Sequence, residues 1–340
     1  MNEILVSLKQ DLKQILDVIV DKNDVLYFDY PLHLNVGDLL IYAGTEAFFQ
    51  DYQINIRLRR CLQSFDLDEV KKYVKPNTTL ICHGGGNFGD LYPAIQGMRE
   101  ALVQTFPNNR IIVMPQTAYF SNLKPKEKSA AIFSAHKDCY LFARDQATYQ
   151  LMKDQFSDKV FLSPDMAHQL YGSALLKNQR FKNQRFKNQR FKNQSAVQKS
   201  AEKTLYFLRK DIEASHLEKN IQAILPANTE VKDWEDILTT QDKYYERICS
   251  GLAKVANKFH QPWLKNVVNN LWYRHSLAVI ERCKDIFQHY DLVITSRLHG
   301  HIFSCLLEIP NEVCDNSYGK NLGYYRQWTQ GLDFVKVYEE

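Results

Sequence analysis

The sequence predicts an α/β protein built on parallel sheets, and three observations support this fold class. Short apolar runs alternate with helical patterns along the chain, which is typical of strands that pair in parallel through helical crossovers. Unusual polar residues follow almost every run, and ligands collect at that end of the strands in open parallel sheets. The length of 340 residues suits two domains of about 150 residues each.

The expected strands are short runs rich in apolar and aromatic residues, at 24–30, 78–83, 110–115, 139–143, 159–163, 203–208 and 291–295. Helical patterns span 38–52 and 92–106, and a longer one runs from 233 to 288. The first 20 residues have apolar residues at helical spacing, interrupted by five charges. They predict an amphipathic helix and argue against a signal-peptide core or a membrane span in that stretch.

A basic repeat separates the two halves of the chain. From Lys177 to Gln194 the unit KNQRF occurs three times, followed by a partial fourth copy. We therefore predict an N-terminal domain at 1–172, a linker or insertion at 173–202 and a C-terminal domain at 203–340. A period of five matches neither a helix nor a strand, which favours a solvated linker. Contact with an anionic polymer or a membrane surface is the alternative interpretation.

The net charge of +4 comes from this repeat, which holds seven basic residues and no acidic ones, so that the rest of the chain sums to −3. That remainder argues against nucleic-acid binding. The seven cysteines are scattered, lie mostly inside apolar runs and form no C-x-x-C pair. We expect them to be reduced core residues of a cytoplasmic protein, with neither a disulfide framework nor a metal site.

The segment HGGGNFGD, from His83 to Asp90, is expected to be a loop that contacts a ligand. Glycine lets the backbone approach a ligand closely, and the helix that follows can offer its N–H groups to an anion. A tight strand-to-helix crossover explains the glycines equally well, although Asn87 and Asp90 favour ligand contact. The pattern is neither the dinucleotide fingerprint nor a P-loop.

Three arginines stand at or just past the ends of predicted strands: Arg144, Arg209 and Arg297. A guanidinium in that position can grip a carboxylate or phosphate with two hydrogen bonds. For any one of them an ion pair with a neighbouring aspartate is the commoner explanation, and the motifs ARD and RKD both place an aspartate close by. The three together favour a site for a small, highly charged anion.

One histidine stands out as a candidate proton donor. His299 follows Arg297 by two residues, in a glycine-containing turn that opens a helix. An imidazole beside an anion is held in its protonated form near neutral pH and can deliver a proton. His301 is expected to face away from this turn. His168 is an intermediate candidate, and His83 is expected only to line the glycine segment.

Seven motifs carry a resemblance to a known family: NVGD, GGGNFGDLYP, TFPNNRIIVMPQ, PDMAHQL, VKDWED, TSRLHGHI and DNSYGKN. In this order, from about Leu26 to Trp328, they resemble bacterial polysaccharide pyruvyltransferases, especially the EpsO-type enzymes of exopolysaccharide and biofilm-matrix clusters. The KNQRF repeat has no place in the family pattern, which suggests a tolerated surface insertion.

The resemblance implies a fold of two Rossmann-like domains that face a cleft, similar to GT-B glycosyltransferases. It implies a transferase that moves the enolpyruvyl unit of phosphoenolpyruvate onto two hydroxyls of a sugar and releases phosphate, with no cofactor and no metal. The implied partners are phosphoenolpyruvate, a saccharide acceptor that could be lipid-linked, and the polysaccharide assembly machinery at the membrane surface.

The resemblance also assigns roles to residues. The family's Arg-x-His pair falls on Arg297 and His299, and a further family arginine falls on Arg209. His299 is the expected general acid, and both arginines are expected to bind the anionic groups of the donor. The other candidate donor- or acceptor-binding residues are Asn35, Asp38, Gly85, Gly86, Asn87, Arg144, His168, Asn316 and Tyr318.

Two other functions stay open at this point. A GT-B-type glycosyltransferase with a nucleotide-sugar donor needs similar basic residues, but it would release a nucleotide in place of phosphate. A non-catalytic carbohydrate- or anion-binding protein would keep the fold, but it has little need of a proton donor at His299.

Overall fold

The computed structural model of the chain describes residues 1–177, 203–210, 216–226, 229–315 and 319–338, which form two compact units. The N-terminal unit comprises Val6–Gln169 and Leu238–Leu277, and the C-terminal unit comprises Met1–Leu5, Leu170–Ile237 and Ala278–Glu340. Residues 238–277 thus cluster with the first half of the chain, whereas the predicted boundaries assign them to the second domain.

The N-terminal unit is built on a parallel sheet. Its strands are β1 (Val25–Phe28), β2 (Ile56–Arg60), β3 (Thr79–Cys82), β4 (Gly85–Gly89), β5 (Ile111–Tyr119), β6 (Cys139–Ala143) and β7 (Val160–Leu162). The strand order is β2-β1-β3-β5-β6-β7, with β4 paired to β5, and every pairing is parallel. All four residues of β1 and of β3 are buried, as expected of a parallel sheet covered on both faces.

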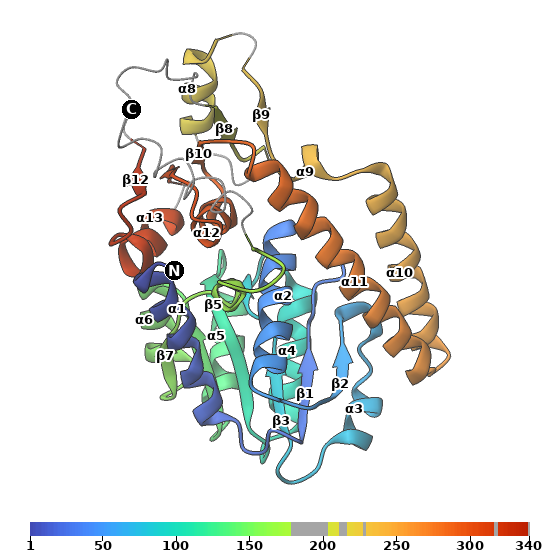
Figure 1. The fold of residues 1–340 in the computed structure, drawn as a ribbon. Coiled ribbons are helices and arrows are strands. Elements are labelled where there is room, and N and C mark those ends of the chain that lie inside the picture. The colour runs from blue at the N-terminus through green and yellow to red at the C-terminus, as the bar shows by residue number, and fades with distance from the viewer. Residues whose placement is uncertain (178–202, 211–215, 227–228, 316–318, 339–340) are drawn as a thin grey trace. The chain divides into compact units, whose positions relative to one another are not determined.

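Helices connect and cover these strands (Figure 1). They are α1 (Glu3–Asp11), α2 (Val36–Asp51), α3 (Leu67–Tyr73), α4 (Pro93–Thr105), α5 (Leu123–Ser134), α6 (Gln146–Gln155), α10 (Thr240–Lys258) and α11 (Pro262–Phe287). Shorter helical turns are η1 (Leu12–Val18), η2 (Leu62–Ser64) and η3 (Met166–Leu170). The predicted amphipathic helix at the N-terminus is confirmed, because its apolar side chains Leu5, Leu8, Leu12 and Ile15 are buried.

Helix α11 explains why residues 238–277 belong to the N-terminal unit. The Trp272 indole donates a hydrogen bond to the carbonyl of Pro31, and Lys265 Nζ lies 2.7 Å from the Glu69 carboxylate. The Asn269 amide donates to the Tyr42 hydroxyl on α2, at 2.7 Å. These buried polar contacts tie α11 to the end of β1 and to α2 and α3.

The C-terminal unit has a second parallel sheet. Its strands are β8 (Thr204–Phe207), β9 (Val231–Lys232), β10 (Leu292–Thr295), β11 (Asn311–Val313) and β12 (Val335–Val337), in the order β12-β11-β10-β8-β9. Its helical elements are α8 (His216–Ile224), α9 (Trp234–Ile237), α12 (Leu298–Leu306), α13 (Lys320–Tyr324) and the π turn η4 (Tyr325–Thr329). Every strand pairing here is parallel as well.

The two sheets share one topology. When the strands of each unit are numbered along the chain and the short β4 is set aside, the C-terminal sheet has the order 2-1-3-4-5, and the N-terminal sheet has the same order with a sixth strand added, 2-1-3-4-5-6. In doubly wound sheets of this order, the chain reverses direction across the sheet between its first and third strands, and ligands bind outside the carboxyl ends of those strands. The candidate positions are therefore the ends of β1 and β3 in one unit and of β8 and β10 in the other.

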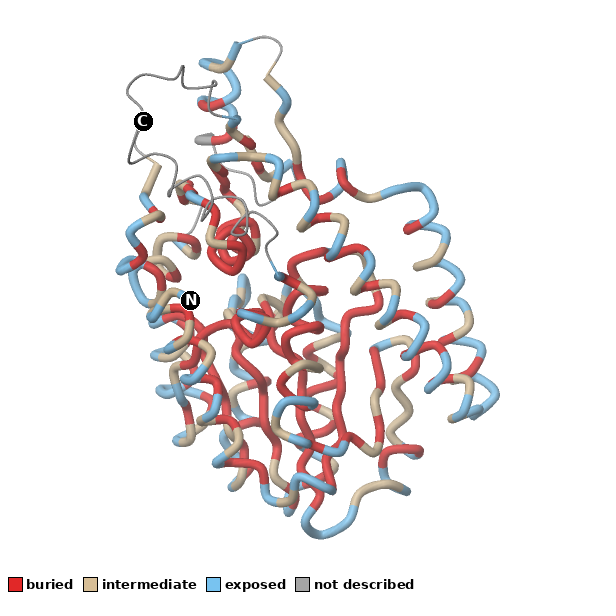
Figure 2. Tube along the Cα trace, in the orientation of Figure 1, coloured by how far each residue is buried: buried red, intermediate tan, exposed pale blue. Residues whose placement is uncertain are grey.

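All seven predicted strands are present, which confirms the α/β class with parallel sheets. The five strands that the patterns did not predict lack an apolar run: β2 reads IRLRR, β4 reads GGNFG, and β9, β11 and β12 have two or three residues each. The cysteines are all free and buried in the interior (Figure 2 shows the buried segments). The prediction that they are reduced core residues is confirmed.

Candidate active site

The turns after β8 and β10 bring Arg209 and Arg297 close together in the C-terminal unit. The two strands are neighbours, with Phe207 opposite Thr295. The backbone N–H of Arg209 donates to the Ser296 hydroxyl at 2.9 Å. Two of the predicted arginines are thereby fixed at the position where this sheet is expected to bind a ligand.

Arg297 is held by a buried aspartate from a third turn. Its Nε donates to Oδ1 of Asp233 at 2.8 Å, and Nη2 donates to Oδ2 of the same carboxylate. The backbone N–H groups of Lys210 and Trp234 also donate to Asp233, at 3.0 and 2.7 Å. An ion pair between an arginine and an aspartate, the commoner explanation for a single arginine, thus forms at Arg297. Its carboxylate comes from Asp233, directly after β9, and not from the ARD or RKD motif. A bidentate pair of this kind fixes the plane of the guanidinium.

Helix α12 begins immediately after Arg297 and presents His299 in its first turn, half-buried. Gly300 is required here, because a Cβ atom would lie 2.5 Å from Thr295 Oγ1 and 3.0 Å from the Phe207 ring. The glycine of the SRLHGH turn therefore lets α12 approach β8 and β10 closely.

His301 has a structural role. Its ring nitrogens bond to the Asn311 side chain at 2.7 Å and to the Thr329 hydroxyl at 2.8 Å. Burial lowers the pKa of His301 to about 4, so the ring is neutral at pH 7. The prediction that His301 faces away from the turn is confirmed.

A second cluster forms in the N-terminal unit, outside the ends of β1 and β3. A cavity of about 50 Å³ there is lined by Asp29, Tyr30, Pro31, Leu32, His33, Asp38, Leu62, Gln63, His83, Asn87 and Ile95. It brings together Asp38 and Asn87, which are predicted site residues, with Asp29, which no motif predicts.

The two candidates from the NVGD motif differ in what they contact. Asn35 caps α2, because its side chain accepts a hydrogen bond from the backbone N–H of Gly37 at 3.1 Å. Asp38 lines the cavity, and its carboxylate lies 3.8 Å from Nε2 of His33. The cap accounts for Asn35, whereas Asp38 presents a carboxylate to the cavity.

Asp29 is the functional candidate that the sequence patterns missed. It directly follows β1 with a left-handed backbone, φ 67°, and its carboxylate lies 2.7 Å from Nη2 of Arg99 on α4. Arg99 also donates to the backbone carbonyl and the side chain of Asn87. Burial raises the pKa of Asp29 to about 7, although Arg99 opposes this shift. A buried, conformationally constrained carboxyl that titrates near neutral pH is typical of functional sites.

His83 is a poor proton donor in this cavity. Its Nδ1 lies 2.6 Å from the Tyr27 hydroxyl, and its Nε2 is buried with no hydrogen-bond partner among the described residues. Burial, reinforced by the charge of Arg99, lowers the pKa of His83 to about 3. The ring is therefore neutral at pH 7, in agreement with the lining role expected for it.

The glycine segment is a strand, and the prediction of a loop is wrong. Gly85 to Gly89 form β4, and Gly85, with φ 126°, pairs with Gln116 of β5. A Cβ atom on Gly89 would overlap the carbonyl oxygen of Tyr119. The close approach of β5 therefore accounts for Gly89 without a ligand. Helix α4 begins only at Pro93, four residues further on.

Arg144 and His168 lie next to the same aspartate. The Arg144 guanidinium is buried against Asp165 and also donates to the Thr117 hydroxyl at 2.9 Å. The backbone N–H of His168 donates to the carbonyl of Asp165 at 3.0 Å, and the ring is buried. The partner of Arg144 is thus Asp165, which comes from a neighbouring loop and not from the ARD motif. Asn316 and Tyr318 lie outside the described residues.

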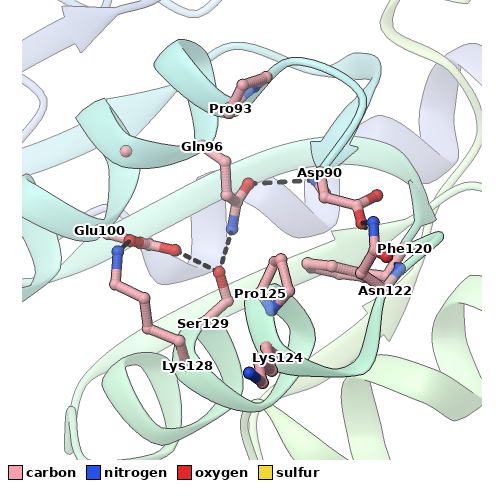
Figure 3. Close-up of a pocket in the computed structure, with 12 residues that line it drawn as sticks. Asp90, Pro93, Gln96, Glu100, Phe120, Asn122, Lys124, Pro125, Lys128 and Ser129 are labelled. Carbon is pink, nitrogen blue, oxygen red and sulfur yellow. Dashed lines mark hydrogen bonds and ion pairs between the residues drawn. The ribbon is translucent and has the colours of Figure 1, made fainter.

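The β4–α4 segment also borders a larger pocket, of about 560 Å³ (Figure 3). Gln96 bridges its wall, because its side chain accepts from the backbone N–H of Gly89 at 3.2 Å and donates to Ser129 at 3.2 Å. Ser129 in turn donates to Glu100, whose other oxygen lies 2.6 Å from Lys128 Nζ. Asn87 and Ile95 of the small cavity are close in sequence to Gly89 and Gln96 of this pocket.

Neither a metal cluster nor a membrane span is found in the described part of the chain. No three His, Cys, Asp or Glu side chains are grouped there so that they could hold a metal ion. No helix among the described residues is long and apolar enough to cross a membrane.

Comparisons with known proteins agree on one family. The family pattern described as "Polysaccharide pyruvyl transferase" matches residues 35–318. The chain is 36% identical to the Bacillus subtilis protein named "Putative pyruvyl transferase EpsO", over 98% of this chain and 94% of the relative. It is 25% identical to "Pyruvyl transferase 1" of Schizosaccharomyces pombe, over 92% and 72% of the two chains.

A solved structure of an uncharacterized protein from Klebsiella pneumoniae shares the fold. The match covers 100% of both chains with a TM-score of 0.58 at 18% sequence identity. The sheets and the matched families define a transferase of the doubly wound α/β class. The chain belongs to the polysaccharide pyruvyl transferase family.

Proposed function

We propose that the chain transfers the enolpyruvyl group of phosphoenolpyruvate to two hydroxyls of a saccharide, as a pyruvate ketal. The observation that carries this proposal is the arrangement after β8 and β10: Arg209 and Arg297 in adjoining turns, with His299 two residues further on. Phosphoenolpyruvate carries a carboxylate and a phosphate on one carbon, so guanidinium groups from two turns are a suitable clamp.

The chemistry needs one proton donor and a stabilised leaving group. In our proposal the His299 imidazolium protonates the methylene carbon of phosphoenolpyruvate, and one sugar hydroxyl adds to the neighbouring carbon. The second hydroxyl then attacks that carbon as its bond to the phosphate oxygen breaks. Of the two hydroxyl protons released, one restores the imidazolium and the other leaves with the departing phosphate as HPO4²⁻. Arg297, held by Asp233, is oriented in advance for the anionic groups, which favours the transition state.

On the acceptor side we propose that Asp38 and Asn87 bind sugar hydroxyls, with Asp29 positioned by Arg99 as a neighbouring acid or base. This proposal rests on the cavity at the ends of β1 and β3. Asn35, Gly85, Arg144 and His168 would support the site through the contacts described above, and Gly86 would do so as a residue of β4. A GT-B-like pair of domains, no cofactor and a cytoplasmic location follow only from the family resemblance, and we propose them on that ground.

The test is the rate of phosphate release from phosphoenolpyruvate with a panel of free and lipid-linked oligosaccharides, with the ketal detected by NMR. For His299→Ala we expect a decrease in kcat of about 10²–10⁴, the usual contribution of a positioned proton donor. The exposed His289 provides the matched control, and His289→Ala should keep the wild-type rate. A fully active His299→Ala variant would remove the histidine from the mechanism.

The rival functions predict other outcomes in the same assay. A glycosyltransferase would release a nucleotide from a nucleotide-sugar donor, and a binding protein would release nothing. The family match does not favour either. Arg297→Lys keeps the charge but cannot make the bidentate contact with Asp233, so we expect it to raise the KM for phosphoenolpyruvate.

A further inference from the structure

Helices α10 and α11 expose an unusual number of large apolar side chains. Phe259 is 60% exposed and Trp263 is 63% exposed, at the turn between the two helices. The apolar stripe consists of Tyr244, Ile248 and Val255 on α10, Phe259 directly after α10, and Trp263, Val267 and Leu271 on α11, each at least 40% exposed. Single exposed apolar residues are ordinary, but a contiguous group on one surface indicates a binding face.

The apolar stripe is not required for packing of the hairpin. Helix α10 buries a different side, which carries Cys249, Ala253 and Ala256. Between the two helices, the Tyr245 ring stacks on His275 with centroids 4.3 Å apart, and its hydroxyl donates to the Leu271 carbonyl at 3.4 Å. Tyr244 of the stripe directly precedes Tyr245, and Leu271 of the stripe supplies the accepting carbonyl, so the stripe adjoins this contact on both helices (Figures 1 and 2 show this pair of helices).

A basic stripe runs beside the apolar one. Each of the first four residues of the apolar stripe directly follows an exposed basic residue, and these are Lys243, Arg247, Lys254 and Lys258. Successive residues of a helix are about 100° apart, so the two sets form parallel rows along α10. The acidic residues of α10 lie elsewhere: Asp242 is buried near His275, and Glu246 is half-buried. The part of α11 that belongs to this unit has no acidic residue.

We propose that the hairpin face, meaning the apolar and basic stripes together, binds an anionic lipid surface and lies in its interfacial plane. A helix with Trp and Phe on one side and Lys and Arg beside them has the composition of interfacial membrane helices. The basic groups would meet anionic headgroups, while the apolar groups enter the acyl boundary. A symmetric contact between two copies would set the two basic rows against each other, which disfavours self-association through this face.

The experiment measures binding of the full chain to vesicles of phosphatidylcholine with and without phosphatidylglycerol. We expect binding to the anionic vesicles that weakens as salt is raised. The double variant Phe259→Ser/Trp263→Ser should lower the partition coefficient by at least about tenfold, because two interfacial anchors are lost. Ile224→Ser, at an apolar residue 74% exposed on α8, is the matched control and should bind as wild type.

A second measurement locates the contact. Trp263 is far more exposed than Trp234 and Trp272, which are 4% and 0% exposed. Its fluorescence should shift to the blue when anionic vesicles are added. Trp263→Phe should keep the binding and lose the blue shift. Phenylalanine also anchors a helix at the interface, but it does not contribute to the tryptophan fluorescence.

Three outcomes would overturn the inference. The first is wild-type binding by the Phe259→Ser/Trp263→Ser protein, which would assign binding to another segment such as the KNQRF repeat. The second is the absence of binding to anionic vesicles. The third is a dimer of the wild type that the double variant dissociates, since a second copy would then cover the face. None of these measurements uses pyruvyl transfer, so the inference and the proposed function can fail separately.

Discussion

Asp29 shows how a single residue can combine a backbone constraint with an unusual charge state. It is buried, adopts a left-handed conformation and contacts Arg99, and burial raises its pKa to about 7. In the unfolded chain an aspartate has a pKa of about 3.9. Between these values the folded chain binds more protons than the unfolded chain. The free energy of unfolding that this group contributes is therefore fully present below the unfolded value and is lost as the pH rises towards 7.

This sign gives a prediction for Asp29→Asn. The variant cannot ionise, so its stability relative to wild type should improve as the pH rises from 4 to 7, by up to about 1.4 kcal/mol per pH unit. Urea unfolding at several pH values measures the difference.

Asp138→Asn is a control with the opposite sign. Burial acts to raise the pKa of Asp138, but hydrogen bonds from Arg110 and Lys159 outweigh it and lower the pKa. That variant should lose stability relative to wild type as the pH rises above the folded value. Identical pH dependence for the two variants would contradict the assignment of Asp29.

At the scale of elements, the packing of α12 on β10 depends on the absence of a side chain at Gly300. Gly300→Ala would place a Cβ atom 2.5 Å from Thr295 Oγ1, which itself donates to the Phe207 carbonyl at 2.8 Å. We expect a loss of about 1–3 kcal/mol in the free energy of unfolding, typical of overpacking, together with lower transferase activity because Arg297 and His299 move with the helix.

The control for Gly300→Ala is Gly97→Ala. Gly97 lies inside α4, and a Cβ atom there would meet nothing within 4 Å. Alanine is favoured over glycine in a helix interior by about 0.5–1 kcal/mol, so this variant should be as stable as wild type or more so. Equal behaviour of both variants in thermal unfolding would refute the close packing at Gly300.

Gly97 also offers a way to fill the pocket of about 560 Å³ between α4 and α5. Its walls combine Phe120 and Pro125 with seven polar or charged residues, whose side chains can donate and accept hydrogen bonds as sugar hydroxyls require. If the rest of the acceptor saccharide occupies this pocket, Gly97→Phe should raise the KM for an oligosaccharide acceptor by about tenfold, or about 1.4 kcal/mol.

Gly97→Ala should leave the acceptor KM unchanged, and both variants should keep the wild-type KM for phosphoenolpyruvate. Equal acceptor KM values for Gly97→Phe and Gly97→Ala would show that the saccharide does not use the pocket. The pair thereby separates a filled pocket from a general effect of substitution in α4.

At the scale of the whole molecule, the KNQRF repeat sets the net charge. Residues 178–202 lie outside the described residues, so the interpretation as a solvated linker stays a prediction. Deletion of 177–194 would change the net charge from +4 to −3. Because seven motifs of the family pattern lie outside this stretch, we expect kcat and both KM values to be unchanged in steady-state assays. A loss of activity in the folded deletion protein would give the repeat a functional role.

Much of the fold was predictable because long apolar runs identify strands that are buried on both faces. The runs around β1, β3, β5 and β10 are of this kind. Strands without such runs were not predictable. In β2, Arg57 and Arg59 alternate with apolar residues and are neutralised by Asp24 and Glu46, and β4 is nearly all glycine.

The candidate site divides in the same way. The positions of Arg209, Arg297 and His299 after strands were readable from the chain, because a polar residue after a buried strand lies at the carboxyl edge of a parallel sheet. The aspartates that hold the arginines were not readable, because Asp233 meets Arg297, Asp165 meets Arg144 and Asp29 meets Arg99 only through strand pairing and helix packing. The patterns also assigned Gly89 to ligand contact, whereas its small size allows the close approach of the neighbouring strand β5.

By itself, then, the sequence determined the fold class, the family and the strand ends that carry the charged residues, since these depend on periodicity and on motifs within short stretches. Only the tertiary structure decided which aspartate holds which arginine, which glycines serve packing, and that the apolar residues of α10 and α11 form an exposed stripe. The physical reason is that hydrophobic periodicity is a local property of the chain. Ion pairing, close backbone approach and exposure depend on residues far apart in sequence that meet only when the chain has folded.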